Sequence, residues 1–214
     1  MKRYLVIISL CFCATGWAQS SDRFQNAMKA NLGAMDSSYK SSSAELSLAN
    51  SFERIANAEK KEWLPYYYAA LMQINYAFMQ EDKSDADAIA DKAETLISKA
   101  DSLKPDNSEI SCIKSMVATI RLMVDPRSRF MQYGPKSSAF LDQAIKQDST
   151  NPRPYYLRAQ TKKYTPEQYG GGCKVALPLF VTAAAKFAAF VPASPIHPSW
   201  GKDKNAIMMV ECKK

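Results

Sequence analysis

The sequence predicts an all-α protein built as a stack of antiparallel helix pairs. Three observations support this class: apolar residues recur at helical spacing along most of the chain, only 7 of the 214 residues are glycine, and no long alternating stretch of Val, Ile and Thr is present. Because 47% of the residues are hydrophobic, the chain is able to bury one sizeable core. We therefore expect a single helical domain.

Eight or nine helices are expected, each an apolar stripe that ends at a turn signal. Their segments are residues 22–35, 44–60, 63–79, 86–103, 109–124, 134–146, 151–164, 174–191 and 201–212. Residues 37–43 form a Ser-rich connector, and residues 125–133 are expected to be an irregular insert before the helix that Gly134 and Pro135 start. The last helix is expected to cap the stack.

The first 18 residues have the features of a secretory signal peptide. Lys2 and Arg3 form a positive start, residues 4–14 are apolar, and Gly16-Trp17-Ala18 offers the small residues that a signal peptidase recognises. Cleavage is expected after Ala18, with export to the periplasm or beyond, and the apolar run is too short to span a bilayer comfortably. The remaining chain divides into an N-terminal helix with its connector, residues 19–43, and one helical domain, residues 44–214.

The formal net charge of +7 falls to +5 when Lys2 and Arg3 are removed, and this charge is spread along the chain. Such a balance is typical of a solvated surface, so nucleic acid is not an expected partner. No later apolar run is long enough and free enough of charge to cross a membrane.

The stretch from Asn151 to Lys174 carries the clearest helix signals. Asn151 is a capping residue and Pro152 suits the first helical position. Thr165-Pro166 repeats that signal for a short turn, and the glycines of residues 170–172 allow backbone conformations that other residues avoid. A helix, an elaborate turn and the start of a second helix are therefore expected.

A small-large-small spacing recurs along the chain and ends with Pro105 in its clearest copy, Ala93, Ile97 and Ala100. The same frame starts at positions 48, 93, 137 and 176, in steps of 45, 44 and 39 residues. Small residues let two helices approach closely, and the large residue fills the adjoining gap. This spacing resembles the second helix of tetratricopeptide repeats (TPRs), although the steps exceed the usual length of about 34 residues.

Four motifs also give the chain a family resemblance: Tyr133-Gly134-Pro135, Asn151-Pro152-Arg153, the run from Tyr164 to Gly172, and Pro198-Ser199-Trp200-Gly201. With these motifs the chain resembles exported, TPR-like proteins of Gram-negative bacteria, a family without an assigned activity. The resemblance implies a TPR-like stack and export, and it supplies no catalytic residues.

Three cysteines remain after the predicted cleavage, because Cys11 and Cys13 lie in the signal peptide. In an oxidising compartment an odd count is explained by one disulfide and one buried thiol. Cys173 and Cys212 are the expected pair, since each lies beside a late helix, whereas Cys112 lies within an apolar helical stripe.

The leading functional hypothesis is a binding or scaffold module of the cell envelope that holds a protein or peptide. Aromatic and arginine side chains are common at interfaces, and the candidate partner-binding residues are Tyr67, Tyr68, Arg127, Arg129 and Tyr156. The alternative is a small-ligand protein or enzyme with a site beside Arg127, Arg129 and Tyr133 and at the turn of residues 170–174, which holds Cys173 and Lys174.

No catalytic constellation is identifiable in the sequence. The only histidine, His197, lies in a Pro-rich connector without an Asp or Asn partner, so Cys173 has no recognisable base. No second His or paired carboxylate has the spacing of metal ligands. A non-enzymatic protein without a cofactor or a metal is therefore expected.

Overall fold

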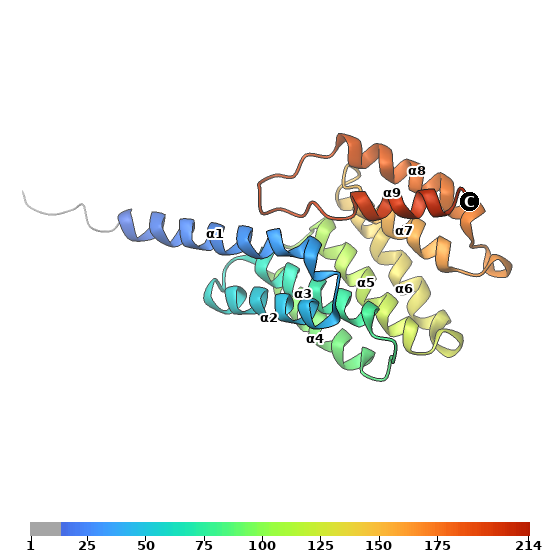
Figure 1. Cartoon of the computed structure of the whole chain (residues 1–214), viewed down its shortest axis with the longest axis horizontal. Helices are drawn as coiled ribbons and strands as arrows, with labels where there is room; N and C mark the ends of the chain where they lie inside the picture. Colours follow the sequence, from blue (N-terminus) through green and yellow to red (C-terminus); the bar gives the residue numbers. More distant parts are fainter. Residues whose placement is uncertain (1–13) are drawn as a thin grey trace, which may run out of the picture.

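The computed structural model describes residues 14–214, which form nine α-helices and one short 3-10 helix and contain no β-strand (Figure 1). The helices are α1 (Ala14–Ser38), α2 (Ser42–Ala58), α3 (Trp63–Met79), α4 (Ala86–Leu103), α5 (Ser108–Val124), α6 (Pro126–Gln147), α7 (Arg153–Tyr164), η1 (Glu167–Tyr169), α8 (Cys173–Ala189) and α9 (Lys202–Glu211). The predicted all-α class is confirmed. Most of the predicted signal peptide lies outside the described residues.

Each helix packs against the next one in the chain, and α3, α5 and α7 also contact one another in succession. This inner row explains why α3 is apolar around most of its circumference: 13 of its 17 residues are buried. The large members of the small-large-small frame lie in the core, where Phe52, Ile97, Leu141 and Phe180 are at most 2% exposed. Their burial agrees with the close helix packing that the spacing predicted at these positions.

Residues 125–133 differ from the sequence-based expectation of an irregular insert. They begin α6, which runs without a break from Pro126 through Pro135 to Gln147. The Asp125 side chain caps the helix by accepting from the amides of Arg127 at 3.2 Å and Ser128 at 3.3 Å. Pro126 occupies the first turn, where its missing N–H costs nothing. The cap followed by proline was the helix signal, and Gly134-Pro135 lies inside the helix rather than starting it.

Replacing Asp125 with alanine is expected to lower the free energy of unfolding by about 1 kcal/mol, because the first amides of α6 lose their acceptor. Urea denaturation of the two proteins measures this difference. Gln143→Ala, on an exposed position later in the same helix, is the control. An equal effect of both substitutions would show that Asp125 does not act as a cap.

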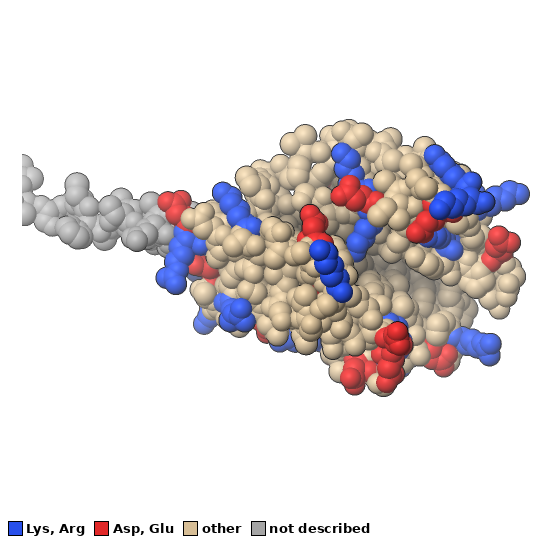
Figure 2. All heavy atoms as spheres, in the orientation of Figure 1, with Lys and Arg blue, Asp and Glu red and all other residues tan. Residues whose placement is uncertain are grey.

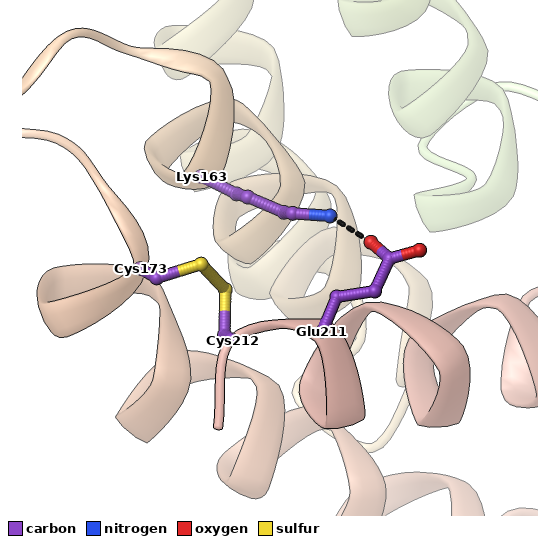
Figure 3. Close-up of a disulfide and its surroundings, with 4 residues drawn as sticks. All are labelled: Lys163, Cys173, Glu211 and Cys212. Carbon is purple, nitrogen blue, oxygen red and sulfur yellow. Dashed lines mark hydrogen bonds and ion pairs between the residues drawn. A yellow bond between two sulfur atoms is a disulfide. The ribbon is translucent and has the colours of Figure 1, made fainter. Parts of the chain in front are cut away.

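The C-terminal segment is fixed to the rest of the fold by several contacts. A disulfide joins Cys173 at the start of α8 to Cys212 just after α9, and Lys163 forms an ion pair with Glu211 beside it (Figure 3). Lys204 of α9 lies 3.5 Å above the ring centroid of Tyr39, in the turn that follows α1. The last helix therefore contacts both its neighbour α8 and the turn between α1 and α2.

Lys and Arg side chains are scattered among Asp and Glu on the face shown in Figure 2, and most of that face is uncharged. Among residues 14–214, none of the helices combines the length and apolarity that crossing a bilayer requires. The same part of the chain contains no group of three His, Cys, Asp or Glu side chains placed to hold a metal ion.

Candidate binding groove

The three tyrosines named as partner-binding candidates are part of the core. Tyr67, Tyr68 and Tyr156 are at most 2% exposed, so they present no surface to a protein partner, and that prediction is wrong for them. All three consecutive tyrosines of α3, Tyr66 to Tyr68, are buried because other helices cover most of the circumference of α3. Its neighbours α2, α4 and α5 contact it.

The two arginine candidates lie in the first turns of α6. Arg127 is exposed, whereas Arg129 donates two hydrogen bonds of 2.8 Å to the carboxylate of Asp87 in α4. This bidentate pair ties α6 to α4, so Arg129 has a structural contact that the sequence did not reveal. Neither arginine lines the groove described next, and the turn of residues 170–174 does not line it either.

A groove of about 570 Å³ lies at the far ends of α6 and α8, away from Arg127 and from the turn of residues 170–174. It is formed by the start of α3, the α4–α5 turn, the α6–α7 turn, the end of α8 and the connection between α8 and α9. The residues that line it are Trp63, Lys104, Asp106, Asn107, Ser108, Glu109, Gln147, Asp148, Thr150, Asn151, Lys186, Ala189, Phe190, Val191, Ala193, His197 and Pro198. Its size lies within the range of small-molecule sites, about 300–1,000 Å³.

The groove combines apolar walls with a charged rim. Trp63, Phe190 and Val191 contribute large apolar surfaces. Lys186 lies in the last turn of α8, and its Nζ donates to the carbonyl of Ser149, in the α6–α7 turn, at 2.8 Å. Lys104, at the end of α4, provides a second cation on a different element.

Residues 190–201, which we call the strap, form one wall of the groove and appear in Figure 1 as the long loop between α8 and α9. The Tyr68 hydroxyl donates to the Ile196 carbonyl at 3.0 Å, and Arg153 donates to the Pro198 carbonyl. The indole of Trp200 donates to the Tyr67 hydroxyl at 2.8 Å. The strap is thus held by the side chains of α3 and α7 that sequence reasoning assigned to a partner or left without a role.

Arg153 and Glu109 form a buried ion pair behind the strap. The Arg153 side chain is 0% exposed, and its Nη1 lies 2.7 Å from Glu109 Oε1. The guanidinium also lies 4.9 Å from the ring centroid of Phe190 and 5.4 Å from that of Trp200. These aromatic faces attract the cation and exclude water from it.

The Glu109 carboxyl has a pKa raised to about 7, because burial penalises its charged form more than Arg153 and Tyr67 favour it. The Tyr67 hydroxyl donates to its Oε2 at 3.3 Å, and burial raises the pKa of Tyr67 well above its usual value. Glu109 therefore titrates near neutrality, whereas Tyr67 stays protonated. One edge of Glu109 still reaches the groove, with 13% of its side chain exposed.

His197 lies on the strap with its Nδ1 2.7 Å from the Ser194 hydroxyl and its ring 5.9 Å from that of Trp63. Burial lowers the pKa of His197, and the charge of Lys104 lowers it further. The imidazole is therefore neutral at physiological pH.

The strap ends at a glycine that no other residue replaces without strain. Gly201 has a φ of 105°, and a Cβ there would lie 2.9 Å from the ring of Phe187. The motif Pro198-Ser199-Trp200-Gly201 thus contains an anchoring carbonyl, an indole donor and the sharp turn into α9.

These features define an exported, all-helical protein with a disulfide-bonded C-terminal segment and a strapped groove of ligand size. No protein-family model matches the chain, and no curated protein matches it either. Among solved structures, the HusA haemophore from Porphyromonas gingivalis matches with a TM-score of 0.79 and 37% sequence identity, over 89% of this chain and 92% of that one. This chain belongs to the family of that haemophore.

Proposed function

We propose that this protein binds haem or a closely related porphyrin in the groove beneath the strap. The observation that carries the proposal is a groove of about 570 Å³ in a chain that is 37% identical to a haemophore along 92% of that protein's length. A non-enzymatic binding role is also the class that the sequence favoured. The groove's size favours a small ligand over the protein or peptide that was first expected.

The chemistry of the groove suits such a ligand. A porphyrin is a flat apolar ring system that carries carboxylates at one edge, so its site needs apolar walls and a few well-placed cations. Trp63, Phe190 and Val191 supply the apolar surface, and Lys104 and Lys186 supply cations from two different helices. The N-terminal end of α5 also lines the groove, and the partial positive charge of a helix N-terminus favours an anion.

The test is a titration of the mature protein with haemin, followed by the haem absorption band and by quenching of the fluorescence of Trp63 and Trp200. Lys104→Glu is expected to bind about tenfold more weakly, since a rim cation becomes an anion that repels the ligand carboxylates. Lys99→Glu makes the same charge change on an exposed position of α4 outside the groove, and it is expected to bind as the wild type does. Absence of saturable binding by the wild type would contradict the proposal.

We also propose the finer architecture and address that the sequence suggested. The burial of the small-large-small frame supports a TPR-like repeat stack, and the disulfide supports folding in an oxidising compartment such as the periplasm. The division into residues 1–18, 19–43 and 44–214, with cleavage after Ala18, is part of the same proposal. N-terminal sequencing of the exported protein tests the cleavage site.

A further inference from the structure

We propose that filling the groove with an anionic ligand drives a proton onto Glu109, so that ligand uptake and proton uptake are coupled. This inference rests on the proposed function, because it concerns the same groove. It assigns to Glu109 a positioning and regulatory part that neither the fold nor the family membership states.

Glu109 lies between the buried ion pair and the groove, so binding in the groove changes the surroundings of its carboxyl. Its carboxylate holds Arg153 and receives Tyr67 on the buried side, and its remaining 13% of exposed side chain faces the groove. A ligand bound in the groove covers this remaining solvent-exposed part of the Glu109 side chain. A carboxylate that loses its remaining water and gains no new donor is destabilised in its charged form.

The charged groups around Glu109 determine the direction in which its pKa shifts when a ligand binds. Arg153 of α7 is the cation that it contacts directly, and Asp148 at the end of α6 opposes its negative charge. Lys104, Asp106, Lys186 and His197 line the rest of the groove. A dianionic ligand that is drawn to the two lysines neutralises them and adds negative charge beside Glu109, so both changes favour the protonated carboxyl.

The direction of the pH dependence follows from linkage. The free protein already has a Glu109 pKa of about 7, above the 4.5 of an unperturbed carboxyl, and the ligand raises it further. Below pH 7 the carboxyl is protonated in both states, so affinity is constant there. Above pH 7 binding must recruit a proton, so affinity falls as pH rises. His197 is neutral in the free protein in this window, because burial and the charge of Lys104 lower its pKa. A proton that His197 takes up when the ligand binds would persist after Glu109 is replaced, so a Glu109 variant separates the two groups.

The experiment is titration calorimetry of the full mature chain with metal-free protoporphyrin IX at pH 7.5, in two buffers of different ionisation enthalpy. The expected result is an uptake of about 0.7 proton for each ligand bound at pH 7.5, where about three quarters of the free protein has Glu109 ionised, and an affinity about tenfold lower at pH 8.5 than at pH 6.5. Heats that do not depend on the buffer, together with a flat affinity profile, would overturn the coupling.

Glu109→Gln provides the matched variant, since the amide keeps the shape and the neutral charge of the protonated carboxyl. It is expected to bind as tightly at pH 8.5 as at pH 6.5 and to take up no proton. Proton uptake that persists in this variant would show that another group titrates, and this result would contradict the inference. A wild type that binds no porphyrin at any pH refutes the proposed function itself, whereas binding without proton uptake refutes only the coupling. The wild-type calorimetry stands alone if the variant does not fold.

Discussion

Arg153→Met is expected to lower the free energy of unfolding by about 3–5 kcal/mol, the usual result of removing one partner of a buried ion pair. The substitution leaves Glu109 buried without its cation and removes the donor that holds the Pro198 carbonyl of the strap. Methionine fills much of the space, so the loss reports the missing charge and hydrogen bonds more than a cavity. Urea denaturation followed by tryptophan fluorescence measures the change.

The pH dependence of this loss has a definite sign. A carboxyl whose folded pKa is raised stabilises the protein fully below its unfolded value of 4.5, and that contribution is lost as pH rises through about 7. Without Arg153 the Glu109 pKa rises further, so Arg153→Met is expected to be more destabilising at pH 8 than at pH 5.5.

Two further variants test the cause. Adding Glu109→Gln to Arg153→Met removes the orphaned charge and should recover part of the lost stability. Arg158→Met, on the same helix, breaks an exposed ion pair with Asp142 and is expected to cost less than about 1 kcal/mol. Equal losses from Arg153→Met and Arg158→Met would show that the buried pair contributes no more than a surface one.

Much of the fold was predictable because helix signals are local. The predicted segments 63–79 and 86–103 match α3 and α4 at both ends, and the apolar stripe of α4 corresponds to the buried face that includes Ile97 and Ala100. The start of α6 was missed because Gly134-Pro135 was given more weight than the Asp125-Pro126 cap. A proline on the exposed side of a long helix is tolerated more readily than that interpretation assumed.

The groove was not predictable, because its parts come from turns far apart in the chain. Lys104 and Asp106 flank Pro105 in the sequence and carry no functional signal of their own, and His197 was considered and set aside as a metal ligand. The sequence did contain an indirect signal. The motifs Asn151-Pro152-Arg153 and Pro198-Ser199-Trp200-Gly201, quoted only for the family resemblance, hold the buried cation and the strap that it anchors. Their shared contact appears only when α7 and the strap are placed together.

The sequence-based candidates Arg127 and Arg129 lie away from the proposed groove for a related reason. Long polar connections attract attention, and residues 125–133, which include Arg127 and Arg129, were expected to form one, whereas Asp125 alone connects α5 to α6. When successive helices run in opposite directions, however, the connections alternate between the two ends of the domain, and here the short turns after α4 and α6 lie at the end that the strap covers. The aromatic residues Tyr67 and Tyr68 do contribute to that site, from behind the strap rather than from the surface.

Removal of the Cys173–Cys212 disulfide by the paired substitutions Cys173→Ser and Cys212→Ser is expected to lower the free energy of unfolding by about 2–4 kcal/mol. The bond closes a loop with a sequence separation of 39 residues, which contains α8, the strap and α9. Without it the unfolded chain gains freedom, and α9 retains few buried contacts of its own, since only Asn205 is buried among its residues. Porphyrin affinity should fall as well, because the strap is tethered at both ends by this loop.

Denaturation of the wild type with and without a reductant checks this result, and the paired variant serves as the control for the reductant. Cys112 is a free, buried thiol in α5 and is expected to be unaffected by either treatment. The reduced wild type should therefore unfold at the same urea concentration as the variant, and the variant should not respond to the reductant. Identical stability of the oxidised and reduced wild type would mean that the packing of α9 through Asn205 and Lys204, rather than the covalent bond, holds the C-terminal segment in place.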